Sequence, residues 1–188
     1  MDFRNLLKYL FVALFSFTIV ACWGSNVKST IKDAPKWFEE TPDKKGFLYS
    51  VGTGLSKDYQ QSINKAKLEA KGELGDMVRS EMKANIDKVF EENMGNASGD
   101  VLDVFSSTYE STFSTLLEDW KILKKEIVRE GDFFRAYVLL EWDEGKAQKR
   151  ALDKIKAKKE IYDAVKANDM IQEMEDKVDK YCERYGCD

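Results

Sequence analysis

The chain has 188 residues, of which 43% are hydrophobic and 34% charged, and its formal net charge is −4; these values fit one globular domain with a solvated surface. The acidic balance and the lack of a basic stripe argue against a nucleic-acid partner, because phosphate binding needs clustered Lys and Arg. The sequence holds no histidine, which excludes Ser–His and Cys–His catalytic pairs, His-ligated metals and histidine-based pH switches.

Residues 1–21 predict a secretory signal peptide. Arg4 and Lys8 provide a positively charged start, and an apolar run of about a dozen residues follows over 10–21. The run is too short for a bilayer-spanning helix, which needs roughly 20 apolar residues. A retained N-terminal anchor or a buried core helix is the alternative interpretation of this segment.

The run ends in Ile19-Val20-Ala21-Cys22, which resembles the lipobox of bacterial lipoproteins. The resemblance implies diacylglycerol on Cys22, signal cleavage between Ala21 and Cys22, and, as a rule, acylation of the new amino group with palmitate or a similar chain. Two or three acyl chains anchor a protein firmly, since each buried CH₂ contributes roughly 0.8 kcal/mol. Trp23 stands where an aspartate would favour the inner membrane, so we expect an outer-membrane lipoprotein that faces the periplasm.

Residues 22–33 are expected to be the lipidated cysteine and a polar tether, and the folded part opens at 34–38 with the sequence Ala-Pro-Lys-Trp-Phe. Pro35 should block helix entry there. A strand is predicted over 47–51, because its alternating residues share one face. These residues are Phe47, Tyr49 and Val51.

The sequence Gly52-Thr53-Gly54 follows this strand, where a phosphate-binding loop would stand. Lys57 occupies the place of the third glycine of a dinucleotide-binding fingerprint, and no βαβ unit follows. We therefore interpret the two glycines as a sharp strand-to-helix turn that needs flexible backbone angles, and we expect no nucleotide cofactor.

Two helices are predicted next. Asp58 should cap the first, with Gln61 three residues on as in a capping box. Apolar residues then recur at helical spacing until the segment 95–99 breaks the pattern. They are Ile63, Ala66, Ala70, Leu74, Met77, Val78, Ile86 and Val89. The second helix is predicted over 101–117, with Val101, Phe105, Thr108, Phe113 and Leu116 turned inward.

A hairpin is predicted from strands over 120–130 and 133–142, joined at Glu130-Gly131-Asp132. The second strand alternates strictly, so one of its faces should be buried. That face consists of Phe134, Ala136, Val138, Leu140 and Trp142. In the first strand the apolar residues change sides, and a β-bulge near Lys124 would explain the change.

The segment 143–188 is expected to be a charged helical extension of the domain at 34–142, with a break and a new helix cap at Asn168-Asp169. Beyond the break, apolar residues step by three and four as in a coiled-coil seam. The seam consists of Ile171, Met174, Val178, Tyr181 and Tyr185. Such a seam must be covered by its own domain or by another subunit, and we expect another subunit, so the expected partner is a second copy of the chain in a homo-oligomer or another envelope protein.

Cys182 and Cys187 are the cysteines that remain after lipidation of Cys22. In an oxidising compartment they are compatible with a local disulfide, and two free thiols in a frayed tail are the equal alternative. Two cysteines alone make an incomplete zinc site. Ser106-Ser107 and Ser111 lack a base placed by any motif, and carboxylate runs such as Glu91-Glu92 fit solvated helix faces. We expect no catalytic, cofactor-binding or metal-binding residue, and no enzymatic activity.

The chain over 34–150 resembles the LPP-twenty family of bacterial lipoproteins. The resemblance is carried by the segment 34–38, the strand and glycines over 48–54, the helix residues Ala66, Ala70 and Gly72, and the aromatic-ended hairpin over 120–142. It implies a compact α+β domain with helices packed on a small antiparallel sheet, held at the outer membrane. Some members of the family are flagellar lipoproteins that assemble around the motor, and others are surface antigens.

The expected fold class is therefore α+β, with an antiparallel sheet of about three strands, two helices packed on it and a long charged C-terminal helix. The expected function is that of a non-enzymatic, membrane-anchored envelope lipoprotein with a structural or assembly role, which the resemblance extends to association with the flagellum. The alternative is a monomeric periplasmic module that binds a small ligand or a cell-wall surface.

Overall fold

The computed structural model describes residues 34–93, 95 and 97–187, which belong to the compact unit Asp33–Asp188. The predicted signal peptide, the lipidation site Cys22 and the tether over 22–33 lie outside the described residues. Among the helices over 34–187, none combines the length and the apolar character that crossing a membrane requires.

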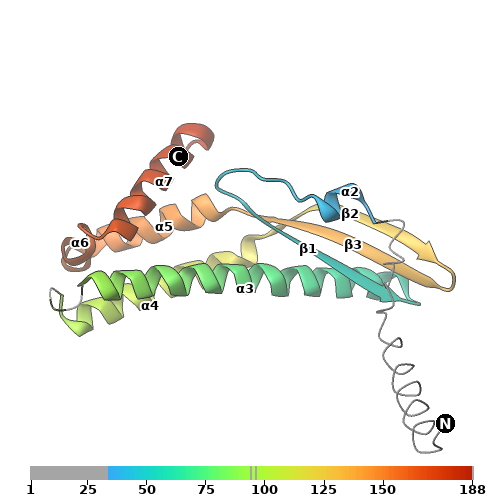
Figure 1. Cartoon of the computed structure of the whole chain (residues 1–188), viewed down its shortest axis with the longest axis horizontal. Helices are drawn as coiled ribbons and strands as arrows, with labels where there is room; N and C mark the ends of the chain where they lie inside the picture. The colour runs from blue at the N-terminus through green and yellow to red at the C-terminus, as the bar shows by residue number, and fades with distance from the viewer. Residues whose placement is uncertain (1–33, 94, 96, 188) are drawn as a thin grey trace, which may run out of the picture. The chain divides into compact units, whose positions relative to one another are not determined.

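The described residues form an α+β fold, as predicted (Figure 1). Its elements, in chain order, are α2 (Lys36–Glu39), β1 (Leu48–Ser56), α3 (Tyr59–Asn93), α4 (Gly99–Leu116), the 3-10 turn η1 (Leu117–Asp119), β2 (Lys121–Glu130), β3 (Phe133–Trp142), α5 (Glu144–Ala157), α6 (Lys159–Val165) and α7 (Asp169–Tyr185). The three strands form one antiparallel sheet in the order β1-β3-β2.

Several predicted boundaries are confirmed by the local hydrogen bonds. Asp58 Oδ1 accepts a bond of 2.7 Å from the backbone N–H of Gln61 at the start of α3. Asn168 Oδ1 accepts one of 2.9 Å from Met170 at the start of α7. The register of β2 against β3 shifts between Ile122 and Lys124, so the predicted bulge is present. Pro35 was expected to block helix entry, and this prediction was wrong. Pro35 lies directly before the single turn of α2, a position that tolerates proline because a residue at a helix N-terminus needs no N–H.

The closest packing in the sheet layer joins β1 to α3. A Cβ atom built on Gly52 would lie 2.2 Å from the Ala66 carbonyl oxygen and 2.5 Å from the Ala70 nitrogen. One built on Gly54 would lie 2.3 Å from the Ser62 carbonyl oxygen. Only a strand without side chains at these two positions lets the helix backbone come so near.

The interpretation of these glycines as a strand-to-helix turn was therefore wrong. Both lie inside β1, which continues to Ser56, and both pair with β3 residues in regular register. Neither has a positive φ angle. The two glycines allow a helix and a strand to pack closely against each other. Sequence alone cannot distinguish a glycine with this role from a glycine in a turn.

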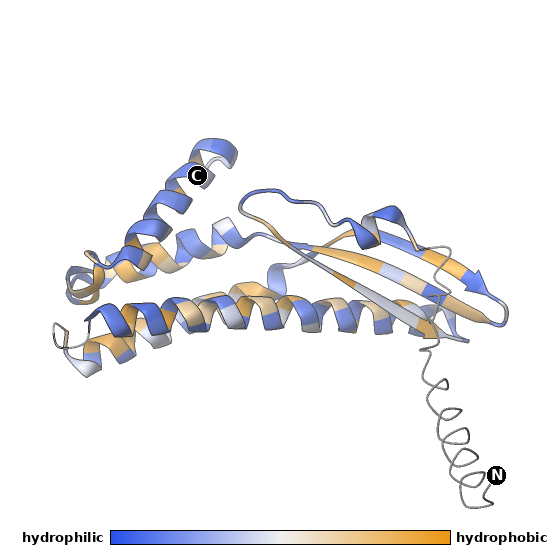
Figure 2. Ribbon diagram, in the orientation of Figure 1, coloured by the Kyte–Doolittle hydropathy of each residue, from blue (hydrophilic) through white to orange (hydrophobic). Residues whose placement is uncertain are grey.

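The apolar face predicted for β3 lies against α3. Ala136, Val138 and Leu140 are fully buried and form one core with Ile63, Ala66 and Ala70 of α3. The opposite face of β3 is also covered, because Tyr137 and Leu139 are buried and the Phe38 ring of α2 packs edge-on against Tyr137 with 5.0 Å between centroids. In Figure 2, β3 is hydrophobic over much of its length.

A second core lies between helices. It joins the C-terminal half of α3 to α4, α5, α6 and α7. Trp142 ends β3 inside this core, and its indole N–H donates a bond of 2.8 Å to the Leu116 carbonyl. Met77 was expected to face inward on α3, but it is exposed because it lies beside the buried stripe.

Most of the C-terminal seam is covered by its own chain, which corrects the expectation that another subunit covers it; Tyr185 at its end is exposed. Ile171, Met174 and Val178 are at most 6% exposed and belong to the second core. The helices after Trp142 thus complete the same compact unit as the sheet. The hydrophilic residues that dominate α7 in Figure 2 leave only this narrow stripe for packing.

Replacing Gly52 tests the contact between α3 and β1. Gly52→Ala should lower the free energy of unfolding by about 3 kcal/mol or more, because the added methyl overlaps helix backbone that cannot move independently. Gly72→Ala is the matched control: no atom lies within 4 Å of its Cβ position, so it should stabilise α3 by roughly 0.5–1 kcal/mol. Urea unfolding of a secreted chain that begins at Lys28 measures both. Equal effects of the two substitutions would contradict the packing.

Candidate functional site

A pocket lies where the loop before β1 meets the start of α5 and the end of α7. Its volume is about 310 Å³. It is lined by Lys45, Gly46, Glu144, Gly145, Gln148, Lys177, Lys180, Tyr181 and Arg184. We name it the basic pocket, because four of these side chains are cationic and one is acidic.

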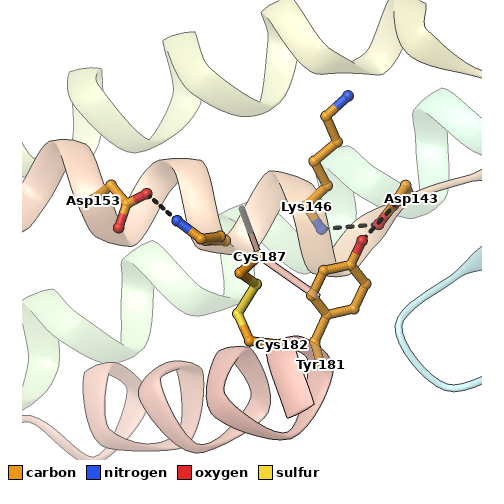
Figure 3. The surroundings of a disulfide bond; sticks show 7 residues. Asp143, Lys146, Asp153, Tyr181, Cys182 and Cys187 are labelled. Carbon is orange, nitrogen blue, oxygen red and sulfur yellow. Dashed lines mark hydrogen bonds and ion pairs between the residues drawn. A yellow bond between two sulfur atoms is a disulfide. The ribbon is translucent and has the colours of Figure 1, made fainter. Parts of the chain in front are cut away.

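Tyr181 fixes the three walls of the basic pocket to one another. Its ring occupies the space where a side chain on Gly145 would stand, 2.1 Å from the position of a Cβ atom. Its hydroxyl donates a bond of 2.8 Å to Asp143, which also caps α5 by accepting from the Lys146 N–H (Figure 3). The Gly145 N–H donates to the Gly46 carbonyl at 3.0 Å. Burial and the bond to Asp143 both raise the pKa of Tyr181, so its hydroxyl keeps its proton.

A second tyrosine holds the loop before β1. The Tyr185 hydroxyl donates to the Lys45 carbonyl at 3.3 Å, and its ring packs edge-on against Phe47 with 5.4 Å between centroids. The ammonium group of Lys44 lies 3.7 Å from the centre of the Phe47 ring. These contacts join two segments from opposite ends of the described chain.

The end of α7 carries a disulfide. Cys182 and Cys187, for which a bond and two free thiols were equal alternatives, are joined in the structure (Figure 3). The short loop between them contains Gly186 with a φ of +80°, a backbone conformation that favours glycine. The bond begins at the residue directly after Tyr181, and Tyr185 lies inside the short loop that it closes.

The cations of the basic pocket come from two elements. Lys177, Lys180 and Arg184 follow one another at helical spacing on α7, and Lys45 faces them from the loop. Within the described residues, none of the four has a carboxylate oxygen within 4.0 Å. Carboxylates of α7 pair with other helices instead, as between Glu173 and Lys88 at 3.3 Å and between Glu175 and Lys156 at 2.8 Å.

Glu144 is the acidic group of the basic pocket. Burial raises its pKa to about 7, and the nearby Glu81 of α3 adds to the rise through its charge and a hydrogen bond, while Lys177 opposes it. Gln148 donates its side-chain N–H to Glu144. Near neutral pH, Glu144 therefore offsets only part of the surrounding positive charge.

The serines singled out in the sequence lie elsewhere. Ser107 and Ser111 line a groove beside Lys154 and Lys158. Their hydroxyls donate to carbonyls of their own helix, at 3.3 Å to Val104 and 3.2 Å to Thr108. Lys158 donates to the Thr108 hydroxyl at 2.9 Å. Ser and Thr hydroxyls within a helix commonly form such bonds to carbonyls of the preceding turn. An activated nucleophile would instead be hydrogen-bonded to a general base.

The carboxylate runs are dispersed over the surface. Glu92 accepts a bond of 3.0 Å from the Asp169 N–H at the start of α7, and Glu173 and Glu175 form the ion pairs given above. In the part of the chain that the structure describes, no three His, Cys, Asp or Glu side chains converge in a way that could hold a metal ion.

The basic pocket was missed in the sequence, where no basic stripe was recognised. A signal was present: Lys177, Lys180 and Arg184 lie at i, i+3 and i+7 on one helix face. The neighbouring acidic residues concealed it, because only the fold shows that Glu173 and Glu175 pair with other helices. Lys45 and Glu144 could not be joined to the stripe without the tertiary structure.

Comparisons with protein-family models, with curated proteins and with solved structures found no match.

Replacing Glu144 tests the electrostatics of the basic pocket. Its pKa is higher in the folded chain, about 7, than its ordinary value of 4.5, so folding is favoured by this group at low pH. That stabilisation is complete below about pH 4.5 and is lost as the pH rises through 7. Glu144→Gln keeps both hydrogen bonds without the charge. It should therefore leave the unfolding free energy nearly unchanged at pH 5 and raise it by about 1–2 kcal/mol at pH 8, after discounting for partial exposure.

The measurement is urea unfolding at both pH values. Glu110→Gln, at an exposed position on α4, removes the same charge away from the pocket and is the matched control. A gain for Glu144→Gln that does not grow with pH, or an equal gain for the control, would contradict this electrostatic account.

Proposed function

We propose that the protein is a lipid-anchored lipoprotein of the bacterial envelope whose α+β domain is a non-enzymatic binding module. The observation that carries the binding role is the basic pocket, with four cations that form no ion pair within 4.0 Å among the described residues. The anchor is supported by the lipobox-like Ile19-Val20-Ala21-Cys22 in the sequence. Membership of the LPP-twenty family and a site on the periplasmic side of the outer membrane are parts of the same proposal.

A binding role is better supported than the assembly role that the sequence first favoured. Ile171, Met174 and Val178 of the apolar seam of α7, on which assembly depended, are buried within the chain, whereas Tyr185 at its end is exposed. The sheet has two edge strands, β1 and β2, and β2 carries Lys121, Lys124 and Lys125 and a bulge. Charged side chains and bulges on an edge strand oppose pairing with a second sheet. A monomeric module therefore fits the described surfaces.

The predicted tether and the disulfide are consistent with a domain held on the periplasmic side of the outer membrane. Residues 22–33 could span at most about 40 Å when extended, which would keep the domain close to the membrane surface. The bond between Cys182 and Cys187 would persist in an oxidising compartment such as the periplasm.

Substitution of Cys22 tests the anchor. Cys22→Ala should abolish incorporation of radioactive palmitate and block signal cleavage, because the thioether and the processing both need that sulfur. Labelling followed by gel electrophoresis and membrane fractionation measures both. Cys182→Ala is the matched control, since it removes a cysteine that is not expected to be lipidated. Normal processing and membrane recovery of the Cys22 variant would overturn the anchor.

A ligand panel tests the binding role. Amino sugars, cell-wall peptides, nucleosides and phosphate compounds are tested for their effect on thermal unfolding, and at least one should raise the melting temperature by several degrees, because a ligand bound only by the folded state stabilises it. Lys180→Trp, which places a large ring at the pocket, should remove the effect, whereas Lys83→Trp on exposed α3 should retain it. No stabilisation by any class of compound would overturn the binding role.

A further inference from the structure

We propose that the basic pocket binds the phosphate group of a small organic phosphate, held by Lys45, Lys177, Lys180 and Arg184. This inference rests on the proposed binding role and names the class of ligand that the pocket accepts. The phosphate belongs either to a free phosphomonoester, with a charge of about −1.5 to −2 near pH 7, or to the singly charged phosphodiester of a phospholipid headgroup, and both present anionic phosphoryl oxygens to the site.

The first argument is the charge balance. Lys177, Lys180 and Arg184 place like charges within two turns of α7, and such neighbours repel one another by a few tenths of a kcal/mol per pair, of which Glu173 and Asp176, four residues before Lys177 and Lys180, offset a part. Lys45 approaches the same pocket from another element. An anion between the four groups removes this repulsion and replaces it with attraction, and a doubly charged phosphate does so more fully than a carboxylate.

The second argument is the donor set. The guanidinium of Arg184, which lies 5.8 Å from the centre of the Tyr185 ring, has the planar fork that matches two phosphate oxygens, and the three lysines supply compact charges. The N-terminus of α5 contributes little to phosphate binding, because the backbone N–H groups of Gly145 and Lys146 already donate to Gly46 and Asp143. Binding must therefore depend on the four cationic side chains, which makes it testable by substitution.

The third argument is size. A volume of about 310 Å³ lies at the lower end of the range for small-molecule pockets and exceeds the needs of a single phosphate ion. The walls are fixed by Tyr181, which is seated on Gly145 and bonded to Asp143. Room therefore remains for the organic group that carries the phosphate, beside the aliphatic stems of the lysines.

Calorimetric titration of the full-length lipoprotein in a neutral detergent tests the proposal. The probes are glycerol 3-phosphate, for free organic phosphates, and glycerophosphoglycerol, for a phospholipid headgroup, each with sodium chloride added to equal ionic strength. One equivalent of at least one probe should bind. The probe that binds more tightly identifies the source of the phosphate.

The variants locate the binding. The double substitution Lys180→Gln and Arg184→Gln should weaken it at least tenfold, whereas Arg184→Lys should retain most of it. The matched control is Lys83→Gln with Lys124→Gln, which removes the same charge from exposed positions on α3 and β2. Circular dichroism confirms that each variant is folded.

Two results would overturn the proposal. One is the absence of binding by both probes, and the other is equal weakening in the pocket variant and the charge-matched control, which would indicate unspecific attraction. If neither phosphate probe binds but another compound of the ligand panel does, the binding role stands and only the ligand class is wrong. If no compound of any class binds, the proposed function fails as well.

Discussion

The contact between α3 and β1 is the constraint on which the rest of the structure depends. Gly52 and Gly54 let the helix backbone lie almost against the strand, and Ala66 and Ala70 keep the helix side of this contact equally thin. Because α3 is one helix of 35 residues, fixing its first half on the sheet also fixes the direction of its second half. The other helices pack against that second half.

Trp142 joins the two cores, as α3 does along its length. Trp142 ends the sheet and is buried among the helices, where its N–H bond to Leu116 ties β3 to the end of α4. The helices after it are needed to cover the second half of α3, so they belong to the fold and not to an appendage. The buried stripe of α7 follows from this requirement.

The basic pocket is a consequence of how α7 returns to the start of the domain. Tyr181 and Tyr185 anchor the end of α7 on the loop before β1, and Gly145 leaves room for the first ring. This arrangement turns one charged face of α7 toward Lys45 and Glu144. Positive charge that would otherwise be spread along a solvated helix is thereby gathered around one open pocket.

The sequence by itself determined the α+β class, the hairpin with its bulge, the buried face of β3 and the caps at Asp58 and Asn168, because these follow from local periodicity and short-range hydrogen bonds. It could not decide the role of Gly52 and Gly54, since a glycine serves a turn and a close contact equally well. Nor could it decide what covers the apolar stripe of α7 or which charges meet at the basic pocket. Those depend on contacts between residues as far apart as Lys45 and Tyr185, which only the tertiary structure brings together.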